Sequence, residues 1–172
     1  RWETEFPGTV VPYLESDRHP IMGIVERREI SRRFLANGYW IKTLERIFAL
    51  KKIVGLAPRS EPIIHLESDN LSFVDDVIVA ELINRCEKIA VPADSTRTGC
   101  ASILFARDSQ VLDAGLEALA SILTAQTGWL SDMELLGIGI NSGVVDELPT
   151  SPDRAWALNH GLTLEDSSEK VG

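Results

Sequence analysis

Residues 62–70 read Pro-Ile-Ile-His-Leu-Glu-Ser-Asp-Asn, a short apolar run that leads directly into two acids. The run Ile63–Leu66 is typical of a buried strand. Side chains two positions apart on a strand point to the same side, so Glu67 and Asp69 are predicted to face one cation. Ligands of open α/β sheets bind at the carboxyl ends of strands, and Mg²⁺ or Mn²⁺ prefers carboxylates there. In the alternative reading, either acid caps the next helix or is simply solvated.

Short strands and helices alternate along the chain. Helices are predicted at 26–35, 39–56, 74–85, 110–126 and 131–140, and strands at 63–66, 88–91 and 100–106. Asp108 is expected to cap the fourth helix, and Ser131 forms a capping box with Glu134 at the start of the fifth. The alternation predicts a single α/β sandwich of three layers with a mostly parallel sheet over residues 1–150, followed by a polar tail over 151–172.

The composition is that of a globular domain with an acidic balance. Seventeen Lys and Arg against 26 Asp and Glu give a formal charge of −9. An acidic chain suits neither duplex DNA nor an anionic membrane, so no nucleic-acid partner is expected. No apolar run approaches the roughly 20 residues of a membrane span, so no integral membrane segment is expected. Residues 21–60 carry nine basic and three acidic side chains. This basic stretch either binds a small anion such as a diphosphate or forms solvated helix faces.

Two features predict a cytoplasmic location. The chain opens without the apolar stretch of a secretory signal. Its two cysteines, Cys86 and Cys100, are too few for a disulfide framework or a zinc site, which favours a reducing compartment.

Three blocks of sequence carry a resemblance to a known superfamily. They are Tyr-Trp-Ile-Lys-Thr-Leu-Glu-Arg at 39–46, His-Leu-Glu-Ser-Asp-Asn at 65–70, and Trp-Leu-Ser-Asp-Met-Glu-Leu-Leu-Gly at 129–137 with Leu-Pro-Thr at 148–150. Over residues 39–150 the chain resembles bacterial glycosyltransferase-like proteins of the nucleotide-diphospho-sugar transferase superfamily, which have a GT-A-type fold and an acidic Asp-x-Asp-like strand end. The resemblance implies a metal-dependent glycosyltransferase, or a fragment of one, that transfers a sugar from a nucleotide-diphosphate donor to a carbohydrate acceptor.

The resemblance also implies roles for the residues at the strand end. Asp69 matches the acid that coordinates the Mg²⁺ or Mn²⁺ ion bridging the donor diphosphate. Glu67 matches the first acid, near the ribose or a metal-bound water, although this position is Glu here rather than Asp. Asn70 closes the same motif and is assigned to donor binding. The cation would offset the charge that builds on the departing nucleoside diphosphate.

Further candidates lie on two of the predicted helices. Thr43 and Arg46 are one turn apart and are predicted to face the same site, with Arg46 contacting a phosphate. The alternative for Arg46 is an ion pair with Glu45 or with another helix. Asp132 is the candidate base that deprotonates the acceptor hydroxyl, with Glu134 second. In the alternative reading, Asp132 only complements the positive amino end of its helix.

Two features have both a functional and a packing reading. The small residues Gly99–Ser102 either let a donor sugar approach the backbone or only permit close packing. Trp129 either stacks on a sugar ring or belongs to the core.

A GT-A-type domain begins with a strand and loop that receive the nucleotide base, and no such unit precedes residue 39. The chain is therefore predicted to be incomplete at its amino terminus or to be a shortened relative, which calls for a neighbouring domain or a homo-oligomer. The alternative function is a non-catalytic carbohydrate-binding or assembly module derived from the same fold. A third reading is a metal-dependent phosphodiester or sugar-phosphate hydrolase that uses the same acids.

Overall fold

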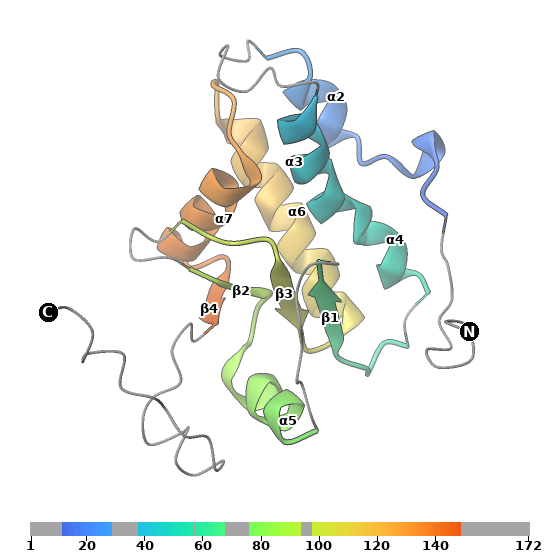
Figure 1. Ribbon diagram of the computed structural model, residues 1–172, viewed down its shortest axis with the longest axis vertical. Helices are drawn as coiled ribbons and strands as arrows, with labels where there is room; N and C mark the ends of the chain where they lie inside the picture. Colours follow the sequence, from blue (N-terminus) through green and yellow to red (C-terminus); the bar gives the residue numbers. More distant parts are fainter. Residues whose placement is uncertain (1–11, 29–37, 57, 68–75, 94–97, 149–172) are drawn as a thin grey trace, which may run out of the picture.

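The computed structural model describes residues 12–28, 38–56, 58–67, 76–93 and 98–148. These residues form an α/β fold in which helices pack on a small sheet (Figure 1). No helix among them is both long and apolar enough to cross a membrane. The predicted polar tail over 151–172 lies outside the described residues.

The sheet has four strands: β1 (Ile63–Leu66), β2 (Ala90–Pro92), β3 (Ile103–Ala106) and β4 (Asp146–Leu148). Their order in space is β1-β3-β2-β4. β3 runs antiparallel to both β1 and β2, whereas β2 and β4 are parallel. Three strands therefore point the same way, and β3 is inserted among them in the opposite direction.

The prediction of a mostly parallel sheet is wrong for these strands, because two of the three pairings are antiparallel. The physical reason is the connection from β2 to β3, which spans only residues 93–102. A parallel pair needs a crossover of about a dozen residues or more, usually a helix, whereas shorter connections join antiparallel strands. A bridge between Ala93 and Gly99 extends the antiparallel pairing into this connection.

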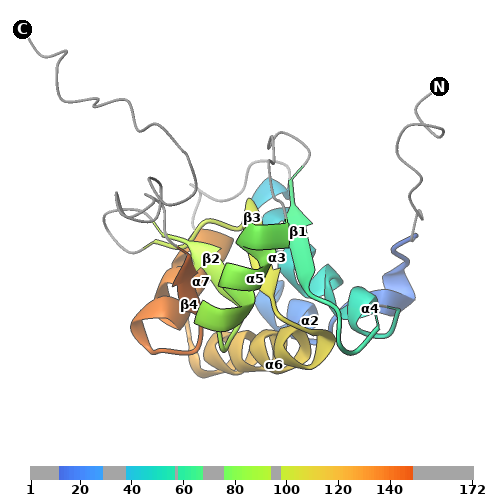
Figure 2. The same ribbon diagram turned by 90° about the horizontal axis from the view of Figure 1, so that it is seen from below.

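Most helices lie on one face of the sheet. They are α2 (Ile21–Val25), α3 (Tyr39–Ala49), α4 (Lys51–Val54), α6 (Ser109–Ala125) and α7 (Asp132–Asn141). Buried side chains of α2, α3, α6 and α7 join Ile63, Leu104 and Ala106 of the sheet in the main hydrophobic core, and partly buried side chains of α4 pack against it. Figure 2 shows α6 running along this side of the strands.

One helix, α5 (Asp76–Arg85), packs on the opposite face. Its partly buried Leu82 packs against a smaller buried cluster that includes Phe105, as does Ile64, which pairs with Phe105 across β1 and β3. Because neighbouring residues of a strand point to opposite faces, Ile63 and Ile64 belong to different clusters.

The predicted helices are largely present. The pattern over 39–56 forms α3 and α4, which meet at Leu50. Both capping predictions are confirmed: the Asp108 carboxylate accepts from the Val111 N–H at 2.8 Å, and Ser131 and Glu134 form the capping box of α7. The helix predicted over 26–35 is not found in its described part, because residues 26–28 form a turn after the end of α2, and residues 29–37 lie outside the described residues.

A short 3₁₀ helix, η1 (Glu15–Asp17), precedes α2, and the residue after it anchors this segment to α3. Arg18 donates from Nε to Glu45 at 2.8 Å and from its terminal nitrogens to Glu26 at 2.6 and 3.0 Å. Lys42 donates to the second oxygen of Glu45 at 2.7 Å. Glu45 is only 4% exposed, so its charge is balanced by a cation on each oxygen.

Candidate functional site

β1 directs alternate side chains toward the face that carries α3 and α7. Ile63 lies in the main core, and His65 is paired with Leu104, a residue of the same core. Glu67 is the next side chain in this series, and its N–H donates to the Ser102 carbonyl at 3.0 Å. The ladder between β1 and β3 thus continues to Glu67, and its carboxylate lies at the carboxyl end of β1 on the α3 side.

Arg46 of α3 joins this carboxylate to the start of α7. Its Nη1 forms an ion pair with Glu67 Oε1, and its Nη2 donates to Asp132 Oδ2 at 3.1 Å. We refer to Arg46, Glu67 and Asp132 as the Arg46 cluster. The side chains are 34%, 21% and 5% exposed, respectively. Three residues predicted from separate segments of the sequence are therefore in contact.

The position of Asp132 follows from how α7 begins. Ser131 is the N-cap, and the Glu134 carboxylate accepts from both the N–H and the hydroxyl of Ser131 at 2.8 Å. This capping box fixes the first turn of α7. Asp132 is the first residue of that turn, and its side chain is buried. Glu134, the second candidate base, uses its carboxylate to cap the helix.

Gly99 packs directly against α7. A Cβ atom at this position would lie 2.4 Å from Leu136 Cβ and 3.1 Å from the Leu136 carbonyl carbon. The Gly99 N–H also donates to the Met133 carbonyl at 3.2 Å. The sequence predicts that the small residues before β3 either admit a donor sugar or permit close packing. The contacts of Gly99 with α7 support close packing at this position. Trp129 likewise packs, partly buried, against the main core.

Several buried polar atoms at the cluster have no hydrogen-bond partner among the described residues. They are Arg46 Nε, His65 Nε2 and Asp132 Oδ1. Glu67 Oε1 contacts Arg46 as an ion pair but without an aligned hydrogen bond. Buried polar atoms in native proteins are nearly always hydrogen-bonded, to protein, water or ligand. These atoms therefore mark a place where a further polar group can bind.

His65 is the residue of this region that sequence reasoning did not select. Burial of its ring lowers the pKa of His65, and the positive charge of Arg46 lowers it further, against the opposing effect of Glu67. The imidazole is therefore neutral near pH 7. The period-two alternation of β1 could have identified it, since His65 shares a face with Glu67.

The cluster contains two carboxylates, the type of ligand that a hard divalent cation prefers. Glu67 and Asp132 each contact one terminal nitrogen of the same guanidinium, so the positive charge of Arg46 lies between them. Within the described residues, no three His, Cys, Asp or Glu side chains gather as a metal site. Mg²⁺, however, is commonly bound by one or two carboxylates, with phosphate oxygens and water completing its shell. Asp69 and Asn70 lie outside the described residues.

The remaining predicted residues lie on α3. Thr43 is buried one turn before Arg46, and its hydroxyl donates to the Trp40 carbonyl at 3.0 Å within the same helix. Arg46 does not contact Glu45, whose oxygens are taken by other cations. Arg46 is paired instead with Asp132 of α7. An ion pair with another helix is one of the two alternatives to a phosphate contact.

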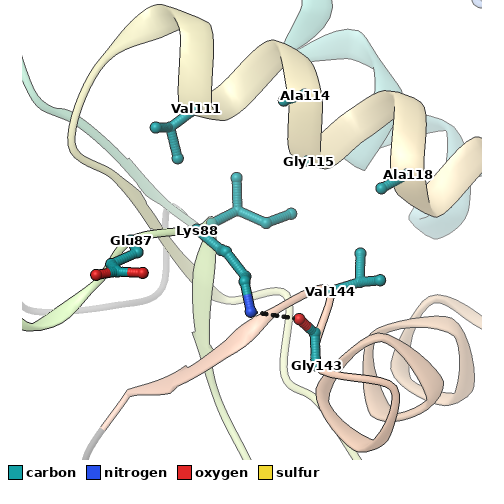
Figure 3. A pocket seen from close by; sticks show the side chains of 9 residues that line it. Glu87, Lys88, Val111, Ala114, Gly115, Ala118, Gly143 and Val144 are labelled. Carbon is teal, nitrogen blue, oxygen red and sulfur yellow. Dashed lines mark hydrogen bonds between the residues drawn. The ribbon is translucent and has the colours of Figure 1, made fainter.

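A separate groove of about 300 Å³ lies beside α6. Ala114, Gly115 and Ala118 form one wall, and Val144 lies opposite (Figure 3). The Lys88 ammonium at its rim donates to the Gly143 carbonyl at 2.5 Å (Figure 3). The groove is mainly apolar, and none of the predicted site residues that the structure describes lines it.

Comparisons with known proteins give no information on the role of the Arg46 cluster. No protein-family model matches the chain, and no match was found among curated proteins or solved structures.

Proposed function

We propose that the chain is a metal-dependent glycosyltransferase domain, or a fragment of one, that binds a nucleotide-sugar donor at the Arg46 cluster. The observation that carries the proposal is the contact of Arg46 with Glu67 and Asp132. The sequence predicts these three residues separately, as a phosphate ligand, a metal ligand and a base. The proposal treats the α/β fold as part of a GT-A-type three-layer sandwich, in the cytoplasm, completed by a neighbouring domain or a second copy.

The carboxyl end of β1 would hold the donor. Glu67, together with Asp69, would bind Mg²⁺ or Mn²⁺, and the ion would offset the negative charge that develops on the leaving diphosphate. Arg46 would add a second positive charge with paired donors that match phosphate oxygens. Thr43 and Asn70 are the further residues assigned to the donor. This location agrees with the general preference of α/β proteins to bind ligands at the carboxyl ends of strands.

Asp132 would act on the carbohydrate acceptor. Its Oδ2 accepts a hydrogen bond from Arg46, while its buried Oδ1 has no partner among the described residues. A general base must lie within hydrogen-bond reach of the proton that it removes. Oδ1 is the unpartnered oxygen that would accept the proton of an acceptor hydroxyl, and because it is buried, neighbouring side chains would have to move for the hydroxyl to reach it.

A second candidate function is a non-catalytic carbohydrate-binding or assembly module. The observation in its favour is that Arg46 pairs with both carboxylates, so the cluster joins α3, β1 and α7 in the manner of a structural ion-pair network. Such a module would have no need of a cation.

Calorimetric titration of the full chain with Mn²⁺, alone and with UDP or GDP, separates the two functions. A transferase is expected to bind Mn²⁺ more tightly with one of the nucleotides. Glu67→Gln and Asp69→Ala should each weaken this binding by roughly tenfold or more. The exposed Glu87→Gln is the matched control and should bind as the wild type does. Absence of both Mn²⁺ and nucleotide binding in the folded wild-type chain would rule out the transferase and leave the module.

A further inference from the structure

We infer that Arg46 exchanges partners during donor binding: a divalent cation displaces it from the two carboxylates, and the released guanidinium then binds the donor diphosphate. This inference rests on the proposed function and deepens it, because it couples the cation to the diphosphate through one side chain. It requires that Arg46 and the cation compete for the same oxygens, and that Arg46 is the member of the cluster that moves.

Competition follows from the contacts of Arg46. Both of its terminal nitrogens are occupied, one by Glu67 and the other by Asp132. A cation that takes the Glu67 carboxylate removes one of these partners and places a like charge beside the guanidinium. The paired arrangement is also incomplete, since Arg46 Nε and Asp132 Oδ1 are buried without partners among the described residues. A ligand with a hydrogen-bond acceptor would satisfy Arg46 Nε, and a cation would satisfy Asp132 Oδ1.

Arg46 is the side chain best able to move. Asp132 is 3% exposed and belongs to the capped first turn of α7. The backbone of Glu67 is held by its hydrogen bond to Ser102. Arg46 has the most exposed side chain of the three, at 34%, and its long flexible stem can carry the guanidinium outward without moving α3.

The exchange predicts reciprocal coupling between the two ligands. The cation binds at the cost of the Arg46 ion pairs, and the diphosphate gives the released guanidinium a new partner. Each ligand therefore strengthens the binding of the other, by the same factor. Without Arg46 the cation meets no competitor, so it should bind more tightly alone and should gain less from the nucleotide.

The test is titration of the full chain with Mn²⁺, with free Mn²⁺ followed by electron paramagnetic resonance, in the absence and presence of UDP or GDP. Arg46→Met should bind Mn²⁺ alone roughly tenfold more tightly than the wild type and should lose most of the enhancement by nucleotide. Arg85→Met is the matched control, because Arg85 forms an exposed pair within α5. It should behave as the wild type does.

Arg46→Lys provides a second variant, since it keeps one positive charge at the cluster while losing the two-pronged contact. It should bind Mn²⁺ alone more tightly than the wild type, by a smaller factor than Arg46→Met. Circular dichroism establishes that each variant is folded. Equal or weaker Mn²⁺ binding by both folded variants would overturn the exchange while leaving a Glu67-dependent cation site intact. Failure of the wild type and both variants to bind Mn²⁺, with or without nucleotide, would overturn the exchange and the proposed transferase together.

Discussion

Replacement of Gly99 by alanine should destabilise the protein by about 2–4 kcal/mol, because α7 leaves no space for a side chain. The new Cβ would lie 2.4 Å from Leu136 Cβ, 3.1 Å from the Leu136 carbonyl carbon and 3.3 Å from the Gly137 nitrogen. These atoms belong to the helix backbone or are attached directly to it, so no rotamer change relieves the contact. Overpacking of this kind costs about 1–3 kcal/mol. Displacement of α7 also weakens the 3.2 Å hydrogen bond from Gly99 to Met133, which adds about 1 kcal/mol.

Urea unfolding followed by circular dichroism measures this loss as a lower midpoint at an unchanged slope. Gly128→Ala is the matched control, since a Cβ at Gly128 meets no atom within 4 Å. The free energy of unfolding of this control should stay within about 0.5 kcal/mol of the wild type. A Gly99→Ala protein as stable as the wild type would refute the close-packing account. It would return Gly99 to the other reading, in which its small size serves a donor sugar.

Three further perturbations test other parts of the structure. Glu45→Gln, which removes a buried charge between two cations, should lower the free energy of unfolding by about 3 kcal/mol. In the same urea assay, Glu81→Gln in an exposed pair should change it by less than about 0.5 kcal/mol; equal losses would contradict the account. Because the pKa of His65 is lowered by burial, the unfolded chain binds more protons, and stability should fall as pH drops below about 6.5. Thermal melts across this range should show a shallower pH dependence for His65→Gln, and an unchanged one would count against the assignment. Iodoacetamide should modify Cys100 faster than Cys86, which is 3% exposed and whose pKa is raised by burial; mass spectrometry of a time course would expose the opposite order.

The parts of the fold that depend on neighbouring residues could be predicted from the sequence. The strand Ile63–Leu66 was expected from a local apolar run and is present with the same bounds. Asp108 and Ser131 are confirmed as N-caps, because capping depends on residues within one helical turn. The acidic pair after the strand also directed attention to Glu67, which lies in the cluster.

The parts that depend on distant residues could not be predicted in this way. β4 contains two acids in three residues and no apolar pattern, and its place is fixed by contacts with residues distant in sequence, above all its pairing with β2. The contact between Arg46 and Asp132 joins residues 86 positions apart, for which the sequence holds no local signal. The direction of β3 is a different case. The short connection from Pro92 to Ile103 excludes a helical crossover and would have predicted an antiparallel pair.

A crystal structure of the full chain with Mn²⁺ and the nucleotide selected by calorimetry would test the central claim most directly, because the anomalous signal of manganese locates the ion. The account predicts a manganese peak on the Glu67 carboxylate, with the Arg46 guanidinium on the diphosphate and no longer on Asp132. A peak elsewhere, such as the groove beside Lys88, would contradict it. So would a bound diphosphate beside an Arg46 that still pairs with both carboxylates.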